Sequence, residues 1–253
     1  MIVRTLHSWD VTTQGAREIQ EKLRRRVSFK APGRLPRLAA GADVSYNKFS
    51  PNLYAAAIVV DLESLDTIEE AGITAKASFP YVPGLLSFRE VPPLLSVFRK
   101  LRTRPQLVIC DGQGYAHPRR FGLACHLGLI LDLPSLGCAK SRLIGDYEDP
   151  GNNRGDFTAL EDGEEVIGSV LRTRTGVSPV FISVGHRMSL EMARELVLRL
   201  TPSYRLPETT RRAHHLVNEL RRASTEDAGR RSHRGDAENA EKDLLNDQRQ
   251  MKK

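Results

Sequence analysis

The sequence has few cysteines and no long apolar run. Its 253 residues include three cysteines, Cys110, Cys125 and Cys138, and no two of them form a CxxC pair. An odd number without metal spacing argues against both a disulfide framework and a zinc site. The N-terminus lacks the apolar core of a signal peptide, and no stretch reaches the roughly 18 apolar residues that span a bilayer. We therefore expect a cytoplasmic protein that has no membrane partner and keeps its cysteines reduced.

Acidic residues are outnumbered by basic ones. The 31 Asp and Glu residues face 38 Lys and Arg residues, which gives a net charge of +7 and a pI of about 9.5. Such a field attracts polyanions, so nucleic acid is the first partner to consider and an acidic membrane surface the second. The charge alone does not choose between them. The length fits one large mixed domain as well as two small ones.

Apolar patterning predicts a mixed sheet. A charged segment, residues 11–26, is typical of a solvated helix. Three strand-like segments joined by short turns then predict an antiparallel meander: Arg37–Ser45, Tyr54–Leu62 and Thr67–Ala77. Strands are next predicted at Gln106–Cys110, Ser135–Ala139 and Val180–Val184. Helices are predicted from Ser87 onward, at Phe121–Leu131 and at Ser189–Leu200. The fold class is therefore α/β, an antiparallel meander plus parallel strands flanked by helices.

Two segments depart from this pattern. Pro92 and Pro93 are expected in the first turn of the helix that starts near Ser87, where their missing amide hydrogens cost least. Residues 221–253 are highly charged and nearly free of large apolar side chains. Such a segment cannot bury enough surface to offset its ordering entropy. We expect a folded domain over residues 1–220 and a disordered tail, whose basic stretch either touches phosphates or is simply solvated.

Three acids stand where the ends of elements would expose them. Asp43 lies in the first strand, Glu90 in the first turn of the helix near Ser87, and Asp111 just past the fourth strand. Side chains at strand ends converge at one edge of an open sheet. Converging carboxylates repel one another unless a hard divalent cation such as Mg²⁺ binds between them. An isolated Asp after a strand is more often a turn or cap residue, and spacing alone does not single out these three among 31 acids.

Six sequence blocks resemble the endonuclease V family, in the family's order and over roughly residues 30–220. The blocks are GADVSY (Gly41–Tyr46), PYVPGLLSFRE (Pro80–Glu90), CDGQGYAHPRRFGLACHLG (Cys110–Gly128), GCAKSRLIG (Gly137–Gly145), ISVGHRMSL (Ile182–Leu190) and RLPETTRRAHH (Arg205–His215). The resemblance implies a ribonuclease H-like fold and an endonuclease V catalytic domain over residues 1–220. It also implies a Mg²⁺-dependent reaction in which Mn²⁺ is expected to substitute.

The resemblance also implies roles for individual residues. Asp43, Glu90 and Asp111 match the metal-binding acids, and His214 matches a position that contributes His or Asp near the metal, although the neighbouring His215 leaves the register open. A second set matches positions at the scissile phosphate. Lys140 would stabilise developing negative charge there, and His117 would contact phosphate or the nucleophilic water.

Base recognition is implied by two further groups of residues. The loop of Pro80, Tyr81, Val82 and Pro83 resembles the family's strand-separating wedge, with Tyr81 replacing the extruded base in the stack. From the residues alone, a tyrosine that packs its own loop is the simpler interpretation. The residues that match the base pocket are Gly84, Leu86, Gly112, Gly122 and Leu123. Glycines suit such a pocket because they let the backbone approach the base closely.

The expected reaction is hydrolysis of the second phosphodiester bond 3′ to a deoxyinosine, which leaves 3′-hydroxyl and 5′-phosphate ends. One alternative is an endoribonuclease specific for inosine in RNA, since no residue indicates how a 2′-hydroxyl would be received. Another is a non-catalytic nucleic-acid-binding protein that kept the fold and the basic surface. The intact acids and Lys140 argue against it. A monomer is expected, and the number of metals in turnover is left open.

Overall fold

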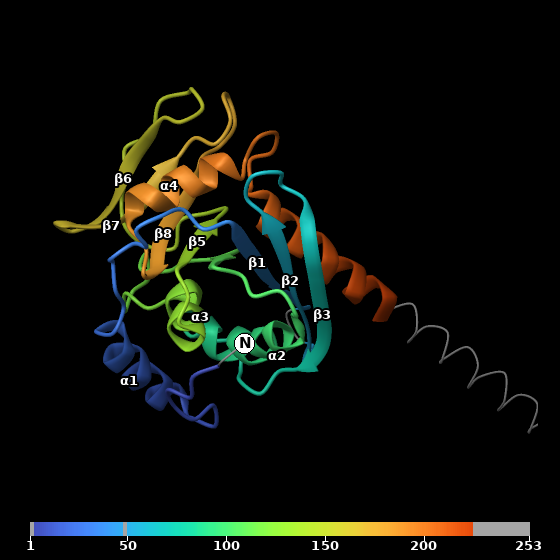
Figure 1. Ribbon diagram of the computed structural model, residues 1–253. Helices are drawn as coiled ribbons and strands as arrows, with labels where there is room; N and C mark the ends of the chain where they lie inside the picture. Colours follow the sequence, from blue (N-terminus) through green and yellow to red (C-terminus); the bar gives the residue numbers. More distant parts are fainter. Residues whose placement is uncertain (1–2, 48–49, 225–253) are drawn as a thin grey trace, which may run out of the picture.

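Eight strands form one mixed sheet in the computed structural model, which describes residues 3–47 and 50–224 (Figure 1). Their order across the sheet is β3-β2-β1-β4-β5-β8-β7-β6. The strands are β1 (Leu38–Ser45), β2 (Asn52–Asp61), β3 (Thr67–Lys76), β4 (Leu107–Cys110), β5 (Ser135–Ala139), β6 (Phe157–Asp162), β7 (Glu165–Leu171) and β8 (Val180–His186).

Strand β1 joins an antiparallel half of the sheet to a parallel pair. It pairs antiparallel with β2, from Leu38 opposite Asp61 to Ser45 opposite Tyr54, and β2 pairs antiparallel with β3. On its other side, β1 runs parallel to β4, which runs parallel to β5. The predicted meander and the mixed sheet are therefore confirmed. The parallel register brings the ends of β1 and β4 to the same edge of the sheet.

Helices cover both faces of the sheet. They are α1 (Thr13–Arg24), α2 (Leu86–Lys100), α3 (Leu123–Leu131), α4 (Leu190–Arg199) and a C-terminal helix, residues 208–224, which Figure 1 draws in orange-red without a label. Successive residues of a strand point to opposite faces. Ala40 and Ala42 of β1 accordingly face α2 and α3, whereas Ala39 lies in the cluster beneath α4. The C-terminal helix packs Ala213 and Val217 against β2.

The expected place of Pro92 and Pro93 was wrong: both lie in the interior of α2. The helix begins at Leu86, within one residue of the predicted Ser87, after a turn that bonds the amide of Leu85 to the carbonyl of Val82 and buries Leu85 and Phe88. Proline has no amide hydrogen, so the carbonyls one turn before the two prolines lose their helical donors. Glu90 had been expected in the first turn of this helix, but it is the fifth residue of α2 and lies just beyond that turn.

The sequence patterns missed β6, β7 and the C-terminal helix. Strand β6 alternates poorly because it lies at the sheet edge and exposes Phe157 at its start. The predicted disordered tail falls almost entirely outside the described residues, although residues 221–224 continue the C-terminal helix. The three cysteines are buried and unpaired, as expected. Within residues 3–47 and 50–224, no helix is long and apolar enough to cross a membrane.

Candidate active site

Asp43, Asp111 and His214 form a cluster at the sheet edge, which we call the acid–histidine cluster. One ligand atom of each residue lies within 4.8 Å of the others. The register of the sheet explains this meeting: Ala42 of β1 pairs with Cys110 of β4, so the next residue on each strand is one of the two acids. The amide of Asp111 also donates to the carbonyl of Ala42, at 3.2 Å. His214 arrives from the C-terminal helix.

The cluster has the electrostatics of a cation site. Burial raises the pKa of Asp43, and the nearby carboxylate of Asp111 raises it further. The ring of His214 opposes this effect through a 2.8 Å contact between Nδ1 and Oδ2 of Asp43. Oδ1 of Asp43 accepts the amide of Val44, at 2.8 Å. Two converging carboxylates and one imidazole are a donor set that fits a divalent cation, because carboxylate oxygens suit Mg²⁺ and Mn²⁺.

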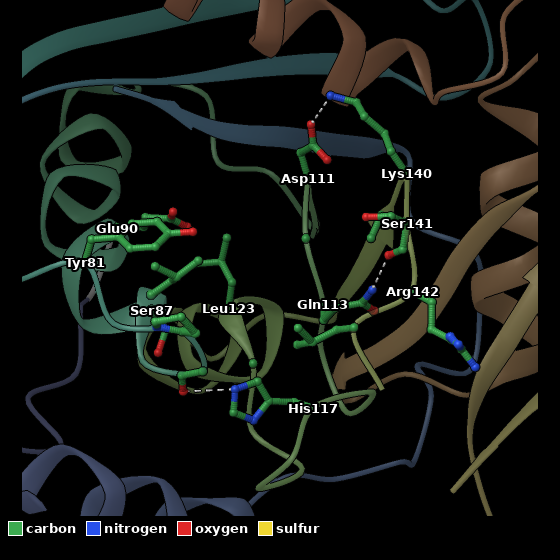
Figure 2. Close-up of a pocket in the computed structure, with 17 residues that line it drawn as sticks. Tyr81, Ser87, Glu90, Asp111, Gln113, His117, Leu123, Lys140, Ser141 and Arg142 are labelled. Atoms are coloured by element: carbon green, nitrogen blue, oxygen red, sulfur yellow. Dashed lines mark hydrogen bonds and ion pairs between the residues drawn. The ribbon is translucent and has the colours of Figure 1, made fainter. Parts of the chain in front are cut away.

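Lys140 lies at the rim of the cluster. It follows β5 directly, and its Nζ donates to Oδ2 of Asp111 at 2.8 Å (Figure 2). The backbone at Lys140 is held by Arg205, whose guanidinium donates to the carbonyls of Lys140 and Pro179, both at 2.7 Å. Lys140 is therefore a half-exposed cation on a fixed strand end, with its charge directed at the acids. Nothing in the sequence pattern had indicated the role of Arg205.

Glu90 lies apart from the three clustered residues. Among the described residues it contributes no ligand atom to the acid–histidine cluster. Its Oε1 instead accepts a hydrogen bond from the hydroxyl of Tyr46, at 3.0 Å. Burial raises the pKa of Glu90 to about 8, with further contributions from Asp43 and Asp111, and the hydrogen bond from Tyr46 lowers it. The two acids thus act on Glu90 electrostatically without contacting it.

His214, and not its neighbour, faces the acids. The ring of His215 is exposed and lies 3.5 Å from Glu219 on the same helix. One residue along a helix turns a side chain by about 100°, since there are 3.6 residues per turn. The sequence left open whether His214 or His215 faces the acids. The packing of the C-terminal helix decides this, because it turns His214 toward Asp43.

A cavity of about 410 Å³ opens beside the cluster (Figure 2). All five residues that the resemblance assigns to a base pocket line it: Gly84, Leu86, Gly112, Gly122 and Leu123. Glu90, Asp111 and Lys140 line it too, so the cavity and the charged groups share one space. Gln113 was missed by the sequence analysis. Its side chain crosses the cavity wall and donates to the carbonyl of Ser141, at 3.1 Å.

One wall of the cavity is fixed by three donors on the carbonyl of Gly84. They are Nε2 of Gln20 at 3.1 Å, Nε2 of His117 at 3.0 Å and the guanidinium of Arg119 at 2.6 Å. Gly84 has a φ of +76°, a backbone conformation that side chains disfavour. Gln20 comes from α1, which the sequence analysis predicted to be a solvated helix. The spacing of apolar residues in α1 therefore did not indicate this contact.

Both ring nitrogens of His117 are engaged. Nδ1 accepts the amide of Arg119 at 3.1 Å, which leaves the proton on Nε2 for the carbonyl of Gly84. Burial lowers the pKa of His117 to about 4, and the charge of Arg119 lowers it further. The ring is therefore neutral and braces Gly84. In this conformation neither nitrogen is free for the phosphate or water contact that the resemblance implies.

The loop of Pro80 to Pro83 stands at the mouth of the cavity, with Tyr81 45% exposed. Arg89 anchors its base by donating to the carbonyl of Phe79, at 2.8 Å. The guanidinium of Arg89 also lies 4.9 Å from the centre of the Tyr46 ring, and that ring meets Tyr81 edge-on at 6.1 Å. Tyr46 thus lies between the loop and Glu90, although the sequence analysis gave it no role.

Comparison with known proteins gives one consistent match. The family model described as Endonuclease V matches residues 18–215. The chain is 48% identical over 221 residues to an Endonuclease V of Myxococcus xanthus, covering 87% of this chain and 94% of that protein. It is also similar to the crystal structure of the Endonuclease V from Streptomyces avermitilis, with a TM-score of 0.83, 46% identity and coverage of 89% of this chain and 100% of that one.

A more distant structure contains nucleic acid. It is Ciona intestinalis Endonuclease V in complex with a 24mer DNA containing an inosine followed by a ribo-adenosine. The TM-score to that structure is 0.74 at 26% identity, covering 83% of this chain and 98% of that one. The similarity therefore extends over most of both chains.

Proposed function

Because the chain belongs to the endonuclease V family, with its ribonuclease H-like fold, we propose that it is a metal-dependent endonuclease acting on DNA that contains deoxyinosine. The bond hydrolysed is the second phosphodiester on the 3′ side of the lesion, which leaves 3′-hydroxyl and 5′-phosphate ends. The observation that carries the proposal is the cluster of Asp43, Asp111 and His214, whose ligand atoms lie within 4.8 Å of one another beside a cavity of about 410 Å³.

The acids would hold a divalent cation, and Lys140 beside them would contribute positive charge. Asp43, Asp111 and His214 would bind Mg²⁺, with Glu90 as a further ligand from α2. When bound, the cation lowers the pKa of a coordinated water and neutralises charge on the phosphate. Lys140 contributes a fixed positive charge at the same edge, where charge develops in the transition state. Its contact with Asp111 keeps it directed at that position.

The cavity receives the extruded base. Gly84, Gly112 and Gly122 let main-chain groups reach the base edge, and the three donors on the carbonyl of Gly84 keep that wall rigid. A base held this rigidly is selected by its hydrogen-bonding edge, so hypoxanthine is accepted and adenine is rejected. Tyr81, exposed at the mouth, fills the gap left in the stack. Extrusion costs a few kcal/mol, roughly, and least for a weakly paired base.

The test is nicking of an end-labelled duplex that carries a single deoxyinosine. With Mg²⁺ we expect one product, cut one nucleotide beyond the lesion, and with excess EDTA we expect none. Restoring activity with Mn²⁺ after EDTA would identify the loss as metal removal. An undamaged duplex of the same sequence is the control for non-specific nicking. If the folded protein binds the duplex but leaves it intact in Mg²⁺, deoxyinosine DNA is not its substrate.

An RNA substrate is the second candidate. It is favoured by the ribo-adenosine that follows the inosine in the DNA bound to the Ciona protein. Matched strands with inosine in DNA, inosine in RNA, and deoxyinosine followed by one ribonucleotide separate the candidates. Cleavage of all three at similar rates would mean that the 2′-hydroxyl is not read. Cleavage of the RNA strand alone would replace the proposed substrate.

Replacing Tyr46 with phenylalanine is expected to raise the Mg²⁺ concentration needed for half-maximal nicking by about tenfold. The change removes the donor on Glu90 but keeps the ring that Arg89 and Tyr81 contact. A hydrogen bond to a charged group contributes roughly 1.5 kcal/mol or more. The measurement is a Mg²⁺ titration of the nicking rate. Tyr54→Phe on the neighbouring strand, whose hydroxyl bonds Ser224, is the control. An unchanged titration would remove Glu90 from the metal site.

A further inference from the structure

An exposed tyrosine lies just before the C-terminal helix that contributes His214 to the acid–histidine cluster, and it does not line the base cavity. Tyr204 lies in the loop before the C-terminal helix and is 51% exposed. The guanidinium of Arg211, on the first turns of that helix, lies 4.3 Å from the centre of its ring. One face of the ring is thus covered by a cation, and a large part of the ring is left to solvent. We call this pair the Tyr204–Arg211 platform.

Arg211 is held rigidly beneath the ring. Glu208 accepts from its Nε at 3.2 Å and from its terminal nitrogen at 2.7 Å. The same carboxylate also accepts from Nε of Arg212, at 2.9 Å. One negative charge is therefore shared between two guanidinium groups, so the platform keeps a net positive charge. An aromatic ring backed by a fixed arginine has the composition of a stacking site for single-stranded nucleic acid.

The platform is connected to the acid–histidine cluster through the C-terminal helix and through Lys140. Arg211 lies three residues before His214, which places the two on neighbouring positions of one helix face. Arg205, the residue after Tyr204, donates to the carbonyl of Lys140. The helix that carries His214 lies beside Asp111, because a ligand atom of His214 lies within 4.8 Å of one of Asp111, and Asp111 accepts from Lys140. The cavity is lined by Tyr81, Gly84 and Leu86 as well as by Asp111 and Lys140, and neither Tyr204 nor Arg211 is among its lining residues.

We propose that, where the bound strand is single-stranded beyond the scissile bond, the Tyr204–Arg211 platform stacks the nucleotide that follows that bond on its 3′ side. The inference rests on the proposed function, because it takes the lesion base to lie in the cavity and the scissile phosphate at the acids. A strand that leaves the cavity in the 3′ direction and passes the acids would continue toward Tyr204, whose neighbour Arg205 contacts the carbonyl of Lys140. Stacking on an aromatic ring tolerates any base, since every base has a π-face. The platform therefore binds the nucleotide on the 3′ side of the scissile bond whatever its base.

The test is binding measured by fluorescence anisotropy in Ca²⁺, under conditions without turnover. Two labelled deoxyinosine strands are compared, one that ends at the phosphate of the scissile bond and one that continues six nucleotides beyond it. Tyr204→Ala is expected to weaken binding of the long strand roughly 5- to 150-fold, the range for loss of one stacked base. It is expected to leave binding of the short strand unchanged. Tyr204→Phe, which keeps the ring, is expected to bind both strands as the wild type does.

The chain offers a matched control in Phe157, an aromatic residue 53% exposed at the far edge of the sheet. Its ring is backed by Arg194 at 4.1 Å, as that of Tyr204 is by Arg211. Phe157→Ala is expected to change neither affinity. Equal losses on the short and long strands, no loss on the long strand, or an equal loss with Phe157→Ala would each overturn the platform.

The platform and the proposed function fail in different ways. If the wild type binds deoxyinosine and undamaged strands alike and nicks neither, the proposed function fails. The platform then fails with it, because the lesion base in the cavity is what places a defined nucleotide at Tyr204. If the wild type nicks at deoxyinosine and Tyr204→Ala binds the long strand normally, only the platform is lost.

Discussion

Replacing Asp43 with alanine is expected to reduce nicking of a deoxyinosine duplex by at least about a thousandfold. Asp43 is the buried member of the acid–histidine cluster and contacts His214 directly. Metal catalysis contributes several kcal/mol, and roughly 1.4 kcal/mol corresponds to a factor of ten in rate. Single-turnover rates with saturating protein measure the loss independently of binding. Isothermal titration with Mn²⁺ should show in parallel that the tightest metal binding has disappeared.

The folded state should survive this substitution. Burial and the neighbouring Asp111 both raise the pKa of Asp43, which means that its negative charge is unfavourable in the folded protein. We therefore expect a melting temperature in EDTA at or above that of the wild type. Asp66→Ala, at an exposed acid in the turn between β2 and β3, is the control and should nick normally. A variant at Asp43 that nicks within tenfold of the wild type would show that the cluster is not the reaction centre.

Replacing Gly122 with alanine is expected to lower both stability and activity. An added Cβ would lie 2.4 Å from the carbonyl oxygen of Gln113 and 2.8 Å from that of Gly114. Both are backbone atoms, and the amide of Gly122 is itself bonded to the carbonyl of Gly114 at 2.9 Å. The start of α3 and the cavity wall must therefore move apart. Overpacking of this kind costs about 1–3 kcal/mol of unfolding free energy.

The effect on nicking should be larger than the effect on folding. A displacement of about 1 Å in a positioned site can cost about a hundredfold in rate, and Gly122 lines the cavity together with Asp111. Urea unfolding and the nicking rate are the two measurements. The control is Gly33→Ala, where an added Cβ meets nothing within 4 Å. If Gly122→Ala unfolded at the same urea concentration as Gly33→Ala and nicked equally well, the close approach at Gly122 would have no consequence.

The local pattern of apolar residues predicted most of the sheet but few of the hydrogen bonds that position the site. Continuous apolar runs such as Tyr54–Leu62 are readable because a strand buried on both faces has no polar position. Strand β6 was missed because its exposure at the sheet edge removes that signal. The start of α2 was predicted to within one residue, and the error lay in placing Pro92 and Pro93 in its first turn. The bounds of a strand or helix were therefore predicted best where a continuous run of buried apolar residues marks them.

The candidate site depended on recognising sequence blocks and not on residue chemistry. Asp43 and Asp111 were singled out among the acids by the blocks that contain them, and the sheet register then explains their meeting. Tyr46 and Arg205 lie in matched blocks and Gln20 does not, but the sequence analysis gave none of the three a role. Each acts through a contact with a residue distant in sequence: the carbonyl of Gly84, the carboxylate of Glu90 and the carbonyl of Lys140. Long-range hydrogen bonds of this kind have no periodicity for a sequence to display.

The acid–histidine cluster draws its members from β1, from the end of β4 and from the C-terminal helix, at positions 43, 111 and 214. A ribosome makes the chain from the N-terminus at roughly 5–20 residues per second, and domains fold as their segments emerge. The strand that carries Asp43 is therefore made many seconds before the helix that carries His214. A nascent chain can assemble much of its sheet while the cluster still lacks one of its three side chains. A prematurely terminated chain that keeps both acids cannot form the full cluster, so the proposed function predicts that nuclease activity is withheld until translation of the domain is almost complete.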